Sequence, residues 1–177
     1  MKATSKIRIR AFRFSDLSYV TLLMRDSFPW LKLYGFLIML GFGKIWDRVY
    51  WAIRTLSLHP LFTNDYERCH FVAEIEGSER VVGFVSSKYK ARYLLDTWGL
   101  HMLCVDPNYR RLGIGTMLTK RIISFAKHKK AKFLFLSVRR DNLAAVNLYQ
   151  KMGFRFDGGK SQLVYMFLGF DCVDSCK

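Results

Sequence analysis

The chain has 177 residues, which is enough for one domain with a buried core and short for two. Hydrophobic residues make up 51% of it and charged residues 24%, which argues against a disordered chain. Lys and Arg number 29 against 14 Asp and Glu, and the resulting formal charge of +15 favours anionic partners. Because no homeodomain, zinc-finger or RNP-type pattern accompanies that charge, no specific nucleic-acid partner is expected.

The cysteines indicate a reduced protein without a structural metal. They form neither a disulfide framework nor a paired CxxC spacing, and no N-terminal signal peptide is evident. Cys172 and Cys176 lack the further ligands that a closed zinc site needs. We therefore expect free thiols, no metal site and a cytoplasmic location.

The first elements in chain order are a strand over 7–11 and a helix over 16–28. An unusual apolar segment then covers about 29–60, interrupted by Lys32 and Lys44. A membrane-spanning helix needs roughly 20 apolar residues, so the run between the two lysines is too short to span. Four interpretations of this segment remain open: a pair of buried helices, a dimer face, a lid over an acceptor site and a membrane-surface helix.

The rest of the chain alternates between strand and helix patterns. The expected elements are strands over 71–75, 81–89, 97–105, 132–138 and 163–168, and helices over 113–128 and 142–151. The strands over 71–75 and 81–89 are expected to form a hairpin. The helix over 113–128 connects two further strands as a strand, helix, strand crossover. This order predicts a single α/β domain over 1–177, with a mixed sheet and helices on its faces.

The stretch 105–116 lies between an expected strand and helix and reads Val-Asp-Pro-Asn-Tyr-Arg-Arg-Leu-Gly-Ile-Gly-Thr. Gly113 and Gly115 lack a Cβ, so the backbone can approach a ligand closely, and the helix N-terminus adds positive partial charge. Arg110 and Arg111 bring forked donors for further phosphate charge. The stretch therefore predicts a diphosphate site.

Two common nucleotide motifs do not fit this stretch, because no GxxxxGK[ST] occurs and Leu118 leaves GxGxxG incomplete. It resembles instead the signature [RQ]xxGx[GA] of the GNAT superfamily of N-acetyltransferases, which Arg110, Gly113 and Gly115 match. A second family signature is matched by Asn142, Ala145, Leu148, Tyr149, Gly153 and Phe154. Among the family's members the chain most resembles protein N-terminal acetyltransferases of the ribosomal-protein-alanine type.

The resemblance implies the GNAT fold, a central mixed, mostly antiparallel sheet with a splayed parallel strand pair and helices on both faces. It implies acetyl-CoA (coenzyme A) as cofactor, with the pantetheine arm along the fourth strand and the pyrophosphate on 111–116. The cofactor-binding residues that it implies are Leu103, Cys104, Val105, Arg110, Arg111, Leu112, Gly113, Ile114, Gly115, Thr116, Asn142, Ala145 and Tyr149.

The reaction that the resemblance implies is direct attack of a neutral amine on the thioester in a ternary complex. Tyr149 is then the general acid for the departing thiolate, and simple packing at a helix end is the alternative for this residue. The acceptor is expected to be a protein or peptide amino group, with a small-molecule amine as the alternative.

The general base is where the chain departs from the family. Related N-terminal acetyltransferases often carry Glu or His on the fifth strand at the place of Ser137, which is no comparable base. His101 is the expected substitute, with side-chain parity shared with Leu103, because an imidazole suits proton transfer near neutral pH. A water chain, Asp96, Glu74 and a purely structural histidine remain alternatives.

Two non-enzyme hypotheses also remain. One is a non-catalytic acetyl-CoA-binding sensor, and the other is a basic membrane-surface or nucleic-acid binding module. The expected partners are acetyl-CoA and an amine acceptor, with no transmembrane segment, and a homodimer stays open.

Overall fold

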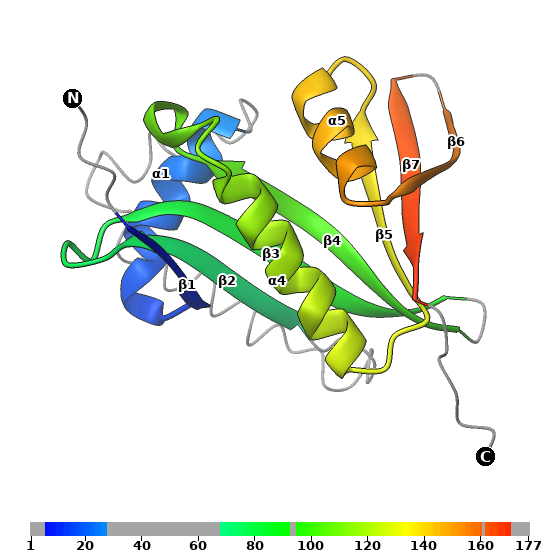
Figure 1. Cartoon of the computed structure of the whole chain (residues 1–177), viewed down its shortest axis with the longest axis horizontal. Helices are drawn as coiled ribbons and strands as arrows, with labels where there is room; N and C mark the ends of the chain where they lie inside the picture. The colour runs from blue at the N-terminus through cyan, green and yellow to red at the C-terminus, as the bar shows by residue number, and fades with distance from the viewer. Residues whose placement is uncertain (1–5, 28–67, 93–94, 161, 171–177) are drawn as a thin grey trace.

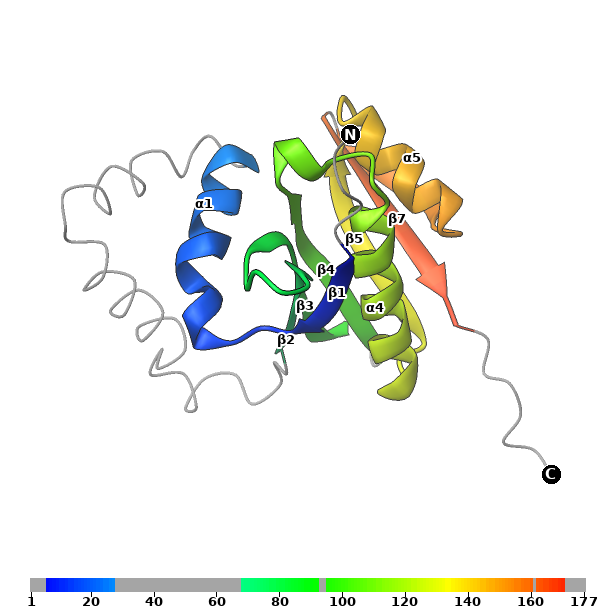
Figure 2. The same ribbon diagram turned by 60° about the vertical axis from the view of Figure 1, so that its left-hand side comes forward.

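The computed structural model describes residues 6–27, 68–92, 95–160 and 162–170. Within these ranges one seven-stranded sheet, in the order β1-β2-β3-β4-β5-β7-β6, separates α1 on one face from α4 and α5 on the other (Figures 1 and 2). The apolar segment expected over 29–60 lies outside the described residues, and a single domain over 1–177 stays a prediction. No helix of the described part is long and apolar enough to cross a membrane.

The observed elements follow the expected order closely. The strands are β1 (Ile7–Ala11), β2 (Arg68–Ile75), β3 (Val81–Arg92), β4 (Leu95–Val105), β5 (Phe133–Arg139), β6 (Arg155–Lys160) and β7 (Leu163–Gly169). The helices are η1 (Phe14–Asp16), α1 (Leu17–Ser27), η4 (Pro107–Tyr109), α4 (Ile114–His128) and α5 (Leu143–Lys151). Only β4 and β5 pair in parallel among these strands, which confirms the mixed, mostly antiparallel sheet.

Helix α4 is fixed by the larger of two core clusters. Its apolar residues recur at helical spacing and are buried against the sheet: Ile114, Leu118, Ile122 and Ala126. Full burial of each large apolar side chain contributes about 1.5–3 kcal/mol. This packing holds the N-terminus of α4 near the C-terminal end of β4.

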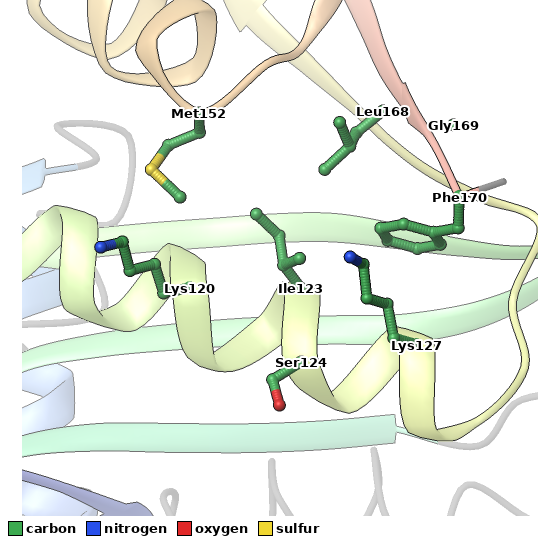
Figure 3. Close-up of a pocket in the computed structure, with 8 residues that line it drawn as sticks. All are labelled: Lys120, Ile123, Ser124, Lys127, Met152, Leu168, Gly169 and Phe170. Atoms are coloured by element: carbon green, nitrogen blue, oxygen red, sulfur yellow. The ribbon is translucent and has the colours of Figure 1, made fainter.

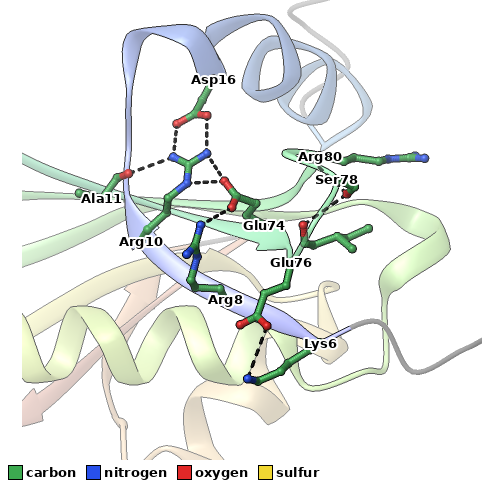
Figure 4. Close-up of polar contacts among 10 residues, drawn as sticks. Lys6, Arg8, Arg10, Ala11, Asp16, Glu74, Glu76, Ser78 and Arg80 are labelled. Atoms are coloured by element: carbon green, nitrogen blue, oxygen red, sulfur yellow. Dashed lines mark hydrogen bonds and ion pairs between the residues drawn. The ribbon is translucent and has the colours of Figure 1, made fainter.

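Helix α1 is fixed at its start by a charged network with β1 and β2 (Figure 4). Arg10 donates to both carboxylate oxygens of Asp16, at 2.7 and 2.8 Å, and also to Glu74, which accepts from Arg8 at 2.7 Å. Burial opposes the ionisation of Asp16, but hydrogen bonds from Arg10 and from the Arg13 backbone prevail and lower its pKa. The network therefore ties the start of α1 to two strands.

Candidate active site

The parallel strands β4 and β5 separate partway along their length. Their ladder runs from the Thr97–Phe133 pair to the Leu100–Leu136 pair, while β4 continues to Val105 and β5 continues beside β7. Figure 1 shows the two ribbons diverging toward their C-terminal ends. The splayed pair expected from the resemblance is present, and 103–105 lie on the part of β4 that has left the ladder.

The glycine loop forms the N-terminus of α4. Gly113 is its N-cap residue with φ of 80°, and Arg111 also has a positive φ, 66°. The backbone N–H of Met117 donates to the carbonyl of Gly113 at 3.0 Å, so the N–H groups of 114–116 precede the first helical hydrogen bond. Together with the positive end of the helix dipole they make a site suited to an anion.

The two glycines of the loop serve different purposes. A Cβ on Gly113 would meet no atom within 4 Å, so what this position requires is the positive φ. A Cβ on Gly115 would lie 3.3 Å from Cδ2 of Leu148, so Gly115 allows α4 and α5 to pack closely. Arg110 donates through Nε to the carbonyl of Val105 at 3.2 Å and so fastens the loop to the end of β4.

Helix α5 brings Tyr149 to the splay. Asn142 caps this helix, with its side-chain oxygen accepting from the Ala145 backbone N–H at 3.2 Å. The Tyr149 ring is buried, and its centroid lies 5.6 Å from that of Phe154. Burial, with a further contribution from the Cys104 thiol on β4, raises the pKa of the Tyr149 phenol. The phenol stays protonated at neutral pH and is suited to donating a proton.

His101 is the extra residue of a β-bulge on β4. In the register with β3, Met102 pairs with Ser86 and Leu100 pairs with Ser87, so His101 is inserted between two successive pairs. A bulge of this kind shifts the alternation of side chains by one residue and re-aims the inserted side chain.

The bulge overturns the expected parity of His101. Leu103 and Val105 pack into the core on the α4 side. By contrast, Nε2 of His101 lies 3.2 Å from the place of a Cβ on Gly99, where Cζ of Phe135 also approaches to 3.0 Å. The prediction that His101 shares a face with Leu103 was wrong, because sequence parity does not register an inserted residue. The exposed imidazole stands on the α1 side, beside the splay.

The alternative bases are less well placed. Hydrogen bonds from Arg8 and then Arg10 lower the pKa of Glu74, so this carboxylate is a weak base held in a structural network. Asp96 accepts a hydrogen bond from the Tyr89 hydroxyl at 2.8 Å, at the end of β4 away from the splay. Glu74 lies on β2 and Asp96 at the start of β4, so neither carboxylate borders the splay.

A hollow that sequence reasoning missed lies between α4 and the end of β7 (Figure 3). It is an open depression of about 450 Å³, lined by Lys120, Ile123, Ser124, Lys127, Met152, Leu168, Gly169 and Phe170. Lys120 and Lys127 follow Thr116 at helical spacing, so one stripe of α4 leads from the glycine loop to the hollow. That spacing was visible in the sequence, but the contribution of β7 was not.

A splayed parallel pair, an anion site at the start of α4 and a tyrosine from α5 together define the GNAT class of fold. Residues 37–154 match the model of the Acetyltransferase (GNAT) family, and the chain belongs to this family. The expected family and fold are thereby confirmed.

Curated relatives carry matching names. The chain is 34% identical over 100 residues to an N-alpha-acetyltransferase of Sulfurisphaera tokodaii, covering 51% of this chain and 59% of that protein. It is 31% identical over 98 residues to the [Ribosomal protein bS18]-alanine N-acetyltransferase of Salmonella typhimurium, covering 55% and 63% of the two chains. The chain thus spans less than two thirds of the length of these relatives.

Solved structures support the fold. PaiA N-acetyltransferase from Thermoplasma acidophilum, in complex with coenzyme A, superposes with a TM-score of 0.65 at 22% identity, covering 93% of this chain and 99% of that one. The ribosomal-protein-S18-alanine N-acetyltransferase of Escherichia coli gives a TM-score of 0.66 at 20% identity, covering 97% and 99%. Acetyl-CoA as the cofactor is confirmed at the level of the family.

Proposed function

We propose that the chain is an N-acetyltransferase that transfers an acetyl group from acetyl-CoA to an amino group of a protein or peptide. The observation that supports this proposal is that the N-terminus of α4, which is suited to an anion, follows the splayed strand β4, while the buried Tyr149 of α5 interacts electrostatically with Cys104 on the same strand. The names of the curated relatives support a protein or peptide acceptor. A small-molecule amine is the second candidate.

The residues present fit the cofactor. The N–H groups of 114–116, with exposed Arg111 beside them, offer several donors to a diphosphate. The part of β4 beyond Leu100 offers backbone groups to an amide-bearing arm. Lys120 and Lys127 offer positive charge to a further phosphate along α4. Bound acetyl-CoA supplies the activated acetyl group as a thioester.

Two side chains at the splay, His101 and Tyr149, carry out the two proton transfers of the reaction. An alkyl ammonium has a pKa of about 10, so an acceptor amine must lose a proton before it can attack. In this proposal His101 takes that proton at an imidazole nitrogen, and the position of its Nε2 near Gly99, on the α1 side, supports this role. Tyr149 holds its proton at the phenol oxygen and gives it to the sulfur as the carbon–sulfur bond breaks. Ser137 has no role as a base.

The proposal is tested by calorimetric titration of acetyl-CoA followed by an assay of released thiol with peptides and small amines. We expect tight binding by the wild-type protein, weakened strongly when Arg111→Glu and Gly113→Glu are combined, and thiol release that depends on a peptide. Release with small amines alone would favour the second candidate. Binding without release would indicate a sensor, and absence of binding by the folded protein would contradict the proposal.

A further inference from the structure

The α1 side of β5 and β7 carries side chains that the mechanism above does not use. Alternate residues of both strands are buried against the α4 side of the sheet, namely Leu134, Leu136, Val138, Val164 and Met166. Because successive side chains of a strand point to opposite faces, the intervening residues point to the α1 side. We call them the β5–β7 row: Phe135, Ser137, Leu163, Tyr165 and Phe167.

Tyr165 brings a phenol to this row. It lies beside Ser137, which occupies the position where related enzymes often carry a residue that can act as a base. Ser137 and Tyr165 are direct partners of the antiparallel β5–β7 ladder. Side chains of such partners lie on one face with their Cβ atoms about 4.5–5.5 Å apart. Tyr165 is 39% exposed, so its side chain is accessible. The phenol therefore belongs to the same part of the surface as Ser137, just beyond Leu136.

His101 borders the same surface from β4. Its imidazole and the ring of Phe135 both approach the space above Gly99, on the α1 side. Phe135 precedes Ser137 on the same face of β5. An acceptor that enters the splay from this side has an imidazole on one flank and the Tyr165 phenol on the other.

The β5–β7 row itself contains no carboxylate. The charged groups next to it include Asp157 of β6, which lies opposite Tyr165, and Arg139 of β5, which lies opposite Leu163 and pairs with Asp141. A carboxylate beside the amine would favour the ammonium form and raise its pKa. A neutral phenol oxygen accepts a hydrogen bond from an amine N–H without that strong preference for the charged form. As the direct hydrogen-bond partner of the acceptor, the Tyr165 phenol therefore favours the charged form of the amine less than a carboxylate at the same position would.

We propose that Tyr165 is a positioning residue whose phenol oxygen accepts a hydrogen bond from the acceptor amine. The inference rests on the proposed function and extends it to the acceptor class. The flanking side chains of Phe135, Leu163 and Phe167 are apolar. They favour an acceptor whose amine is attached to an apolar group, such as a peptide that begins with Leu or Phe.

The test compares Tyr165→Phe, which removes only the phenol oxygen, with Tyr89→Phe at the other end of the sheet. Both are assayed with peptides that differ only in a first residue of Leu, Phe, Ser or Asp. We expect wild-type kcat/KM to be at least about tenfold higher for Leu and Phe than for Asp, because the row is apolar. In Tyr165→Phe the acceptor KM should rise about fivefold or more, since a hydrogen bond is lost. Its kcat should change less than its KM, and its affinity for acetyl-CoA and its Tm should stay unchanged.

A second variant, Tyr165→Asp, tests the charge argument. The new carboxylate should raise the pKa of the bound amine and move the rise of kcat/KM to higher pH, which a merely structural role would not do. An unchanged acceptor KM in Tyr165→Phe, or an equal loss in Tyr89→Phe, would overturn the role of Tyr165. If no peptide and no amine stimulates thiol release by the wild-type protein, that result would instead overturn the proposed function, and this inference with it.

Discussion

Leu100 and Leu136 are the last partners of the parallel β4–β5 ladder, and both are buried on the α4 side. The residues that follow them directly are His101 and Ser137, on the two strands that then separate. A firmly packed pair is thus followed at once by the positions whose side chains border the splay. The parallel ladder thus joins β4 to β5 up to this pair and leaves β4 unpaired with β5 beyond it.

The glycine loop gives the first prediction. Gly113→Ala should destabilise the protein by about 1 kcal/mol, because alanine resists the positive φ, and should weaken acetyl-CoA binding at least fivefold. Gly77→Ala is the matched control, since Gly77 has φ of 83° and equally open surroundings in the β2–β3 turn. Thermal unfolding and calorimetry should show similar losses of stability and a binding defect in Gly113→Ala alone. If both variants bound acetyl-CoA equally well, the glycine loop would not be part of the cofactor site.

Tyr149 gives the second prediction. Tyr149→Phe should lower kcat about a hundredfold or more with little change in acetyl-CoA affinity, because it removes a proton donor and keeps the buried ring. Since burial raises the pKa of the phenol, Tyr149 should cause no loss of wild-type kcat up to about pH 10, where an ordinary tyrosine ionises. The measurement is a pH series of kcat for both proteins. Normal turnover by Tyr149→Phe would leave this residue a packing role.

The hollow beside α4 gives the third prediction. Lys120→Glu should weaken the binding of CoA by about tenfold, because it places a negative charge beside the phosphate path from the glycine loop. The binding of 3′-dephospho-CoA should change much less if Lys120 meets the 3′-phosphate. The CoA affinity of Lys127→Glu, a change farther along the same stripe of α4, tests whether Lys127 also contributes to phosphate binding. Equal losses for both ligands would place Lys120 at the pyrophosphate instead.

The sequence predicted the glycine loop and the α4 crossover because their signals are local. Positive φ at Gly113 and the apolar spacing of α4 are both written in short stretches of chain. By contrast, β6 was missed, because Gly158 and Gly159 interrupt its alternation and its register shifts within this edge strand. A strand that depends on β7 for its pairing leaves little local pattern.

The orientation of His101 was wrong for a related reason. An inserted residue is recognised only when the partner strand is known, and the register of β3 is a long-range property. The position of Tyr165 beside Ser137 follows likewise from the β5–β7 register and leaves no local signal in the sequence. Local pattern therefore found the cofactor side of the site, while strand pairing was needed for the acceptor side.

The charged network at α1 gives the fourth prediction. Glu74→Gln should cost about 1–3 kcal/mol near pH 7, because two arginines lose a charged acceptor. The folded-state pKa of Glu74 is lowered, so its stabilisation is complete above the unfolded pKa of about 4.3 and is lost as pH falls through the folded value. The difference between wild type and variant should therefore shrink in acid. Urea unfolding from pH 3 to 7 checks this.

The matched control for that series is Glu76→Gln. Its ion pair with Lys6 is 3.5 Å long and exposed, so its removal should cost less than about 1 kcal/mol. A similar loss in both variants would mean that the network stabilises no more than an ordinary surface pair.

His101 gives the last prediction. His101→Gln should lower kcat about a hundredfold near pH 7 and leave acetyl-CoA affinity unchanged, because the imidazole borders the acceptor side of the splay. Turnover of the variant should recover as pH rises toward 10, where more of the acceptor amine is already neutral. His128→Gln, at the end of α4, is the control and should behave as wild type. If His101→Gln instead keeps its kcat across the whole pH range, the acceptor amine loses its proton through water, and the bulge serves only to open β4 to the cofactor.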